Sequence, residues 1–179
     1  MIRKNSPRQV VPNVRELDER DAPALLEYFQ TLVRVDPERV ERPEDIALLS
    51  VDDEREWIRH RMADLVTSDL TAHCAVLNDR IVAVGELQRM KRWIERHVAE
   101  IRFGVLPDAR DAALALVRAF VALAKVNNIE LLVFFHLATQ ERAIEVMLEC
   151  GFQEVARIPG YYKKPDGTMI DRVYLVKIL

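Results

Sequence analysis

The stretch VAEIRFGVLPDARDAALALVRAFVALA, residues 98–124, predicts a strand, a short turn and a long apolar helix. Ile101, Phe103 and Val105 alternate with charged residues and a glycine, which is the period of a half-buried strand. Pro107 ends the strand, because proline has no N–H to donate to a sheet ladder. We interpret the remainder of the chain as elements that pack against this strand–turn–helix unit or surround the turn.

A long helix follows the turn. Asp108 is a candidate N-cap, because its carboxylate can accept from the free amides of the first turn. Leu116, Phe120 and Leu123 then recur at helical spacing. A strand that leads through a turn into a helix N-terminus suits an anion, since free N–H groups point outward and the helix dipole adds partial positive charge.

Size and composition favour one domain with a sizeable core, because half of the 179 residues are apolar. We expect a loose tail at residues 1–9 and a single domain at residues 10–179. The net charge of −3, with both signs interleaved, argues against a dedicated nucleic-acid or membrane-surface binder.

The isolated cysteines, Cys74 and Cys150, predict buried thiols in a reducing compartment. The first 12 residues lack the apolar segment of a signal peptide, and no apolar run approaches the roughly 20 residues that span a bilayer. We therefore expect a soluble cytoplasmic protein. The spacing of histidine, cysteine and aspartate suggests no metal site.

Coarse patterns along the chain predict the element order β-α-α-β-β-β-α-β-α-β-β. The later strand–helix–strand run predicts one parallel pair of strands in an otherwise antiparallel sheet. Asp21 and Thr139 are expected to cap helices, and residues 35–50 read as a loop with at most one helical turn. Asn78 and Asp79 predict a hairpin turn.

Other local expectations concern helix and strand ends. The helix that opens with acids at 52–54 should bury a stripe of Ile58, Met62, Leu65 and Val66. Gly151 should end the helix before it. The Pro159-Gly160 pair should interrupt the last hairpin.

With this element order, three local sequences resemble the GNAT superfamily of acyl-CoA-dependent N-acetyltransferases. They are RHVAEIR at 96–102 with VLPDAR at 105–110, AIEVMLECGF at 143–152, and PGYY at 159–162 with PDGT at 165–168. The resemblance covers about residues 14–177. It implies a GNAT fold: a mixed, mostly antiparallel sheet of six to seven strands, a splayed central parallel pair and helices on both faces.

The resemblance also implies acetyl-CoA as co-substrate and an amine acceptor. In this family the strand before the turn pairs with the pantetheine arm, and the turn and helix N-terminus hold the pyrophosphate. The implied cofactor-binding residues are Phe103, Gly104, Val105, Arg110, Asp111, Ala112, Ala113, Leu114, Ala115 and Gln140.

Four positions depart from the family pattern. The mildest departure is Gln140, which stands where the family often has an asparagine that contacts CoA and which can still make amide hydrogen bonds. Ala113 replaces the main glycine of the phosphate turn, and Asp111 places a carboxylate beside a dianionic ligand. Asp111 could equally stabilise an unliganded helix N-terminus. Met147 stands where the family often has a tyrosine that protonates the leaving thiolate, and a methionine has no proton to give; a core filler is the simpler interpretation.

Candidate catalytic residues are Glu100, Glu86 and Tyr162. Either glutamate, on a partly buried strand, could act as the general base, and a salt bridge with a neighbouring arginine is an equal alternative. Tyr162 and its neighbour Tyr161 could contact substrate, serve as the missing acid or simply pack. His97 and His136 are interpreted as structural.

Two functions stay open. One is N-acetyl transfer from acetyl-CoA to a primary amine of a small molecule or protein, by direct attack in a ternary complex. The other is a catalytically impaired module that binds acyl-CoA or a protein partner without turnover, which Asp111, Ala113 and Met147 favour. No residue supports a CoA-independent enzyme on this fold. A homodimer through the last strands is expected from the resemblance.

Overall fold

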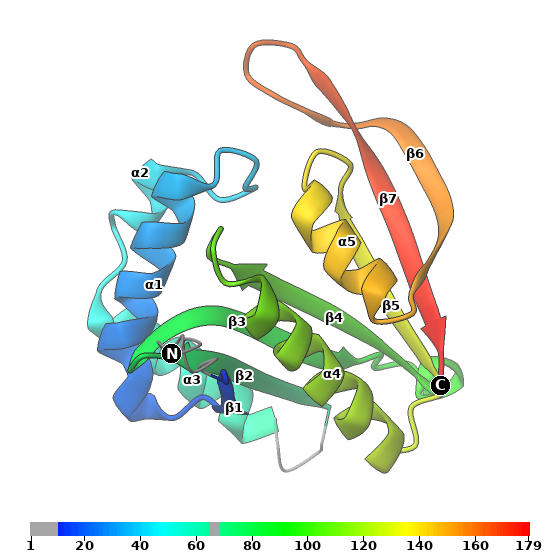
Figure 1. Cartoon of the computed structure of the whole chain (residues 1–179), viewed down its shortest axis with the longest axis horizontal. Coiled ribbons are helices and arrows are strands. Elements are labelled where there is room, and N and C mark those ends of the chain that lie inside the picture. Colours follow the sequence, from blue (N-terminus) through cyan, green and yellow to red (C-terminus); the bar gives the residue numbers. More distant parts are fainter. Residues whose placement is uncertain (1–10, 65–68) are drawn as a thin grey trace, which may run out of the picture.

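The computed structural model describes residues 11–64 and 69–179, so the expected tail at residues 1–9 lies outside the described residues. Its strands form one seven-stranded sheet in the order β1-β2-β3-β4-β5-β7-β6 (Figure 1). The strands are β1 (Asn13–Glu16), β2 (Leu70–Leu77), β3 (Arg80–Arg89), β4 (Val98–Val105), β5 (Leu131–Leu137), β6 (Gln153–Lys163) and β7 (Met169–Ile178).

The helices complete the order expected from sequence. They are α1 (Ala22–Val35), α2 (Pro43–Ile46), α3 (Val51–Asp64), α4 (Arg110–Val126) and α5 (Glu141–Glu149), with short 3-10 helices at Glu19–Asp21 and Trp93–Glu95. The single helical turn expected within residues 35–50 is α2. The mixed α/β fold with one parallel strand pair is confirmed.

Helices cover both faces of the sheet (Figure 1). Helices α4 and α5 pack on one face, where Phe120 and Met147 are fully buried with Phe134 of β5. Helices α1 and α3 pack on the other face around Leu25 and Ile58. The interpretation of Met147 as a core filler is therefore confirmed.

The central parallel pair separates part-way along its length. The β4–β5 ladder holds only from Val98↔Leu131 to Glu100↔Val133, whereas β4 stays paired with β3 as far as Ala83↔Val105. The last part of β4 therefore faces a gap in the sheet, and this gap decides where a ligand can enter.

Two turns match their sequence signals. Asn78 and Asp79 have φ of 51° and 60°, as a tight hairpin turn between β2 and β3 requires. Gly151 ends α5 with φ of 84°, a left-handed conformation that favours glycine.

Asp21 is the N-cap residue of α1, as expected, but its side chain makes no capping bond, and the caps expected at Asp108 and Thr139 are wrong. Asp21 instead accepts from the Asp18 N–H at 2.8 Å and from Arg15 at 2.6 Å. Helix α4 starts after Ala109, one residue later than expected, and its N-cap makes no side-chain bond. Helix α5 likewise starts after Gln140. In each case a competing partner or a one-residue shift removes the cap.

Two further expectations need correction. Met62 is 41% exposed and does not continue the buried stripe of Ile58, while Leu65 and Val66 lie outside the described residues. Strand β6 runs through Pro159 and Gly160, because an irregularity in register, rather than a break, accommodates them.

Among the described helices, none is long and apolar enough to cross a bilayer.

Candidate functional site

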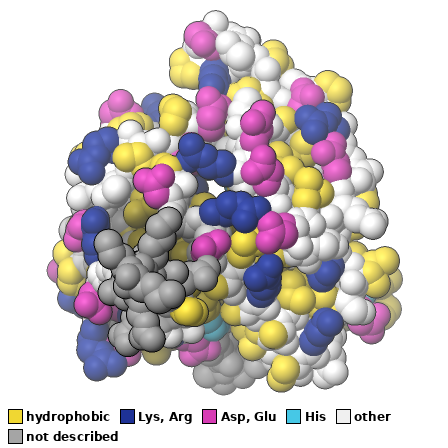
Figure 2. Space-filling view, viewed as in Figure 1, with side chains coloured by type: hydrophobic (Ala, Val, Ile, Leu, Met, Phe, Trp, Pro, Cys, Tyr) yellow, Lys and Arg dark blue, Asp and Glu magenta, His cyan; other side chains and the backbone are white. Residues whose placement is uncertain are grey.

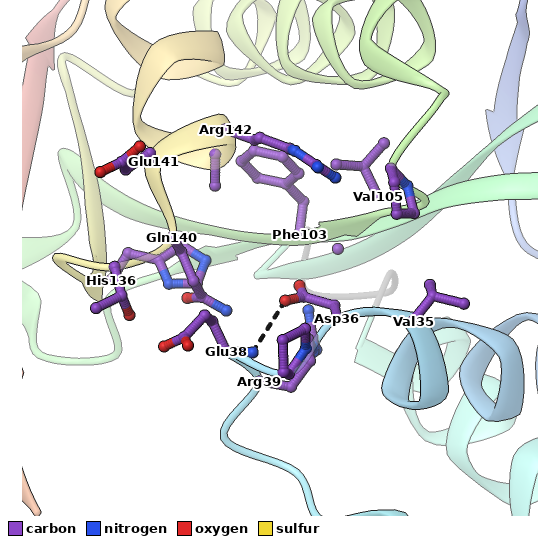
Figure 3. A pocket seen from close by; sticks show the side chains of 15 residues that line it. Val35, Asp36, Glu38, Arg39, Phe103, Val105, His136, Gln140, Glu141 and Arg142 are labelled. Carbon is purple, nitrogen blue, oxygen red and sulfur yellow. Dashed lines mark hydrogen bonds between the residues drawn. The ribbon is translucent and has the colours of Figure 1, made fainter. Parts of the chain in front are cut away.

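A cavity of about 290 Å³ lies where β4 and β5 diverge (Figure 3). Three segments surround it: the end of β4, the connection from α1 to α2, and the connection from β5 into α5. The lining residues are Val35, Asp36, Pro37, Glu38, Arg39, Phe103, Gly104, Val105, Pro107, His136, Thr139, Gln140, Glu141, Arg142 and Ala143.

Main-chain groups of β4 point into this gap. The Leu106 N–H donates to Val82 O, and the Met90 N–H donates to Val98 O, each at 2.9 Å. Successive residues of an antiparallel ladder point their main-chain groups to alternate sides. The N–H groups of Phe103 and Val105 therefore point away from β3, toward the side where β5 has left the ladder.

Gln140 supplies a polar side chain to the cavity wall. The residue is 9% exposed, and its Oε1 atom has no hydrogen-bond partner within residues 11–64 and 69–179. A buried carbonyl oxygen without a partner costs free energy, so this atom is suited to accept a hydrogen bond from a ligand.

The start of α4 offers unused donors beside this cavity. The main-chain N–H groups of Arg110 and Asp111 have no protein partner in the described part of the chain, and those of Ala112 and Ala113 both donate to Ala109 O. None of the predicted residues 110–115 lines the cavity itself. Pro107 is the last residue before α4 that does.

The side chains of this first turn divide into two groups. Ala112, Ala113 and Leu114 are buried in the core under α4, so the methyl group of Ala113 faces the sheet rather than a ligand. Asp111 is exposed. Arg110 is paired with Glu149 at 2.5 Å. Of the two departures in this turn, only the carboxylate of Asp111 can act on an anion at the helix N-terminus.

A second cavity of about 250 Å³ adjoins the first on the α1–α3 side of the sheet, and the two share Arg39, Phe103 and Gly104. Aromatic and charged side chains line it. They are Tyr28, Phe29, Trp57, Glu41, Arg61, Glu86 and Arg102, together with Val84 and Gly85.

Of the three predicted catalytic residues, only Glu86 reaches either cavity. Its carboxylate accepts from Arg61 Nε at 2.9 Å, and its side chain is 14% exposed. Arg61 also stacks on Trp57, 3.7 Å from the ring centroid. Glu100 is bound by Arg102 Nε at 2.6 Å and lies outside both linings.

Tyr162 lies on β6, outside both cavities, and packs edge-on against Tyr161. Burial raises the pKa of Tyr162. The exposed Trp93 lies just before β4, whereas both cavities lie at the other end of that strand.

Charged side chains of both signs gather around a hollow between the α1–α2 side and the α5 side of the molecule (Figure 2). Glu38 connects these parts: hydrogen bonds from Thr139 and then Lys164 hold the pKa of its carboxyl below its usual value.

His136 is a neutral ring in the wall of the first cavity, because burial and then the nearby Arg39 charge lower its pKa to about 3. Its Nδ1 accepts from the Leu137 N–H at 3.1 Å.

Sequence reasoning missed several wall residues. Tyr28 was not among the residues expected on the apolar face of its helix, and Arg39 belonged to residues 35–50, which were expected to form a loop. Arg142 follows Glu141 at the start of α5 and had no distinguishing neighbour. The helical spacing of Tyr28 from Leu25 and Leu32 was the available signal for its burial, whereas nothing in residues 35–50 singled out Arg39.

Within residues 11–64 and 69–179, no group of three or more His, Cys, Asp or Glu side chains is placed to hold a metal ion.

The family model for the acetyltransferase (GNAT) domain matches residues 13–153. The chain therefore belongs to the GNAT acetyltransferase family. Comparison with curated proteins finds no match.

Solved structures share the fold at low sequence identity. A GNAT-family acetyltransferase from Streptococcus pneumoniae is 15% identical with a TM-score of 0.80, over 94% of this chain and 99% of that chain. A ribosomal-protein-alanine N-acetyltransferase from Brucella melitensis is 20% identical with a TM-score of 0.76, over 93% and 99%. A phosphinothricin acetyltransferase from Sinorhizobium meliloti, solved with acetyl-CoA, is 14% identical with a TM-score of 0.77, over 94% and 89%.

Proposed function

We propose that this protein transfers the acetyl group of acetyl-CoA to a primary amine by direct attack in a ternary complex. The observation that carries the proposal is the early end of the β4–β5 ladder at Glu100↔Val133, with a cavity at the divergence. A GNAT-family chain with this opening can admit a pantetheine arm between the two strands.

The cavity residues suit that arm. The Phe103 and Val105 main-chain groups would pair with its amides as a further strand would. Gln140 Oε1, buried without a partner, would accept from an amide N–H of the arm. The free N–H groups of Arg110 and Asp111 at the start of α4 would face the pyrophosphate.

The second cavity would hold the acceptor. It joins the first at Gly104, so an amine there can reach a thioester carbonyl that lies beside the end of β4. Holding two reactants in one geometry supplies much of the rate acceleration of such a reaction. Glu41 and Glu86 both line this cavity, and Glu41 is paired with Arg39. Glu86 would take the amine proton, with Arg61 fixing its orientation.

The test is an assay of CoA release, in which a thiol reagent reports free CoA while a panel of small amines, amino acids and peptides is screened. We expect acetyl-CoA-dependent release with at least one class of amine, and a fall of about 10²-fold or more in Glu86→Gln. Tight acetyl-CoA binding without release for any amine would contradict catalysis and favour the impaired module. Failure to bind acetyl-CoA would overturn both.

A further inference from the structure

Two polar side chains meet at the junction of the cavities, above Gly104. A Cβ atom on Gly104 would lie 2.9 Å from the Tyr28 hydroxyl oxygen and 2.9 Å from Arg39 Nη1. Both groups therefore approach the main chain of β4 only because this residue has no side chain.

Tyr28 is buried, at 3% exposed, on the face of α1 that packs against the sheet. Its hydroxyl has no partner with hydrogen-bond geometry in the described part of the chain. An unused buried donor beside a cavity points to a ligand atom that accepts.

Arg39 is oriented with its charge toward the same point. Its Nε and Nη2 atoms bind Glu41, at 2.9 and 2.8 Å, which leaves Nη1 on the side of Gly104. The Arg39 side chain is 12% exposed and that of Glu41 is 34% exposed, so the acid lies on the solvent side of the pair. The pair acts as a dipole with its positive end at the junction.

Besides Arg39, the charged residues that line the first cavity are Asp36, Glu38, Glu141 and Arg142, of which Glu38 is paired with Lys164. Asp36 and Glu41 oppose Arg39 in setting the pKa of Tyr28, which burial raises above its usual value. His136 is neutral. Glu86, Arg61 and Arg102 lie in the adjoining cavity, where Arg61 binds Glu86 and Arg102 binds Glu100.

We propose that the Tyr28 hydroxyl and the Arg39 guanidinium stabilise the negative charge on the CoA sulfur as the thioester C–S bond breaks. This inference rests on the proposed function. The amine nitrogen forms the new C–N bond and loses a proton to the base. The C–S bonding pair leaves on sulfur as a thiolate, which accepts a hydrogen bond from Tyr28 beside the positive charge of Arg39.

In this chain, Tyr28 and Arg39 would stabilise the thiolate in place of the tyrosine that protonates it elsewhere in the family, where this chain has Met147. Met147 is fully buried under α5 and has no proton to give. Tyr28 keeps its own proton, because burial disfavours the phenolate. The thiolate is then protonated by water when CoA leaves, so the products are the amide and free CoA.

The test measures the pKa of the bound CoA thiol and requires no acceptor. The dissociation constants of CoA and of desulfo-CoA, which lacks the sulfur, are measured by calorimetry between pH 6 and pH 10. Their ratio isolates the thiol. We expect the thiolate to bind about tenfold more tightly than the thiol, which corresponds to a thiol pKa lower by about 1 in the complex.

Variants separate the contributions. Tyr28→Phe and Arg39→Gln should each return the bound thiol pKa toward that of free CoA. Glu41→Gln removes the opposing acid and should leave the preference for thiolate intact or larger. Tyr174→Phe removes a hydroxyl from β7, outside both cavities, and should change nothing. Tyr28→Phe should not lower the thermal midpoint, because the hydroxyl has no protein partner to lose.

The outcomes are distinguishable. Equal pH dependence for CoA and desulfo-CoA in the native protein would overturn this inference and leave the proposed function standing. The same shift in Tyr28→Phe and Arg39→Gln as in the native protein would also overturn it. No binding of either compound would overturn the proposed function and this inference with it.

Discussion

Glu38 and Lys164 are 126 residues apart in sequence and form an ion pair of 3.1 Å. The pair joins the α1–α2 connection to the tip of the β6–β7 hairpin, and Thr139 adds a third element at the start of α5. Of these three segments, the α1–α2 connection and the start of α5 line the first cavity. We therefore expect the pair to hold the Glu38 side of the cavity wall in place.

We expect Lys164→Ala to weaken acetyl-CoA binding several-fold while lowering the free energy of unfolding by less than about 1 kcal/mol, since both side chains are partly exposed. Calorimetry and chemical denaturation measure the two quantities. Arg157→Ala removes a comparable exposed pair with Glu154 outside the cavity walls and serves as the control. Equal affinity in Lys164→Ala and the native protein would show that the pair does not hold this wall in place.

Substitutions of Asp111 and Ala113, the two departures in the phosphate turn, should have different effects on acetyl-CoA binding. Asp111→Asn removes an exposed charge beside the free N–H groups of α4, and we expect about fivefold tighter acetyl-CoA binding at low salt, from about 1 kcal/mol of repulsion. The advantage should shrink as salt is added.

Ala113→Gly should not improve binding, because the Ala113 methyl group is buried in the core. It should instead destabilise α4 by about 1 kcal/mol. A gain in affinity from Ala113→Gly, with none from Asp111→Asn, would contradict the placement of these residues.

The close approach at Gly104 leads to a third prediction. In Gly104→Ala the added methyl group would lie 2.8 Å from Leu32 Cδ2 and 2.9 Å from both Tyr28 Oη and Arg39 Nη1. We expect a loss of about 1–3 kcal/mol in unfolding free energy and a fall in CoA release larger than the fall in acetyl-CoA affinity. Steady-state kinetics at saturating acetyl-CoA measures this, and unchanged turnover would argue against crowding at the junction.

Glu54 should make stability depend on pH. The residue is 4% exposed, and burial, followed by the charge of Asp53, raises its pKa to about 7. A carboxyl whose pKa is higher in the folded state favours folding when protonated, so stability falls as pH rises from about 4.5 to about 7.

Glu54→Gln should therefore raise the free energy of unfolding at pH 8, by up to about 3 kcal/mol, and change it little at pH 4.5. Urea denaturation at the two pH values measures the difference. Glu44→Gln, in an exposed helix start on α2, is the control. A Glu54 variant with the same change at both pH values would contradict the burial argument.

The sequence predicted the fold because local patterns and long-range packing agree at most elements. The alternation around Ile101 and Phe103 and the helical period through Phe120 are the features that bury these residues in one core. The caps failed where a side chain had a better partner elsewhere, as when Arg15 binds Asp21. A pattern within one segment carries no information about such partners.

The site was harder to predict for the same reason. Gly104 and Gln140 came from the family resemblance, whereas Tyr28 and Arg39 become notable only when α1 and its following loop lie over Gly104. Glu100 and Glu86 looked equivalent in sequence. They differ because Arg102 holds one and Arg61 holds the other, and only Glu86 faces a cavity.

The central claim is that the gap between β4 and β5 holds acetyl-CoA, and calorimetric titration of the native protein and Gln140→Leu tests it most directly. We predict saturable micromolar binding to the native protein, and weaker binding to Gln140→Leu with undiminished thermal stability, since Gln140 Oε1 has no protein partner in residues 11–64 and 69–179. No detectable binding at millimolar acetyl-CoA, or equal affinity in the two proteins, would contradict it.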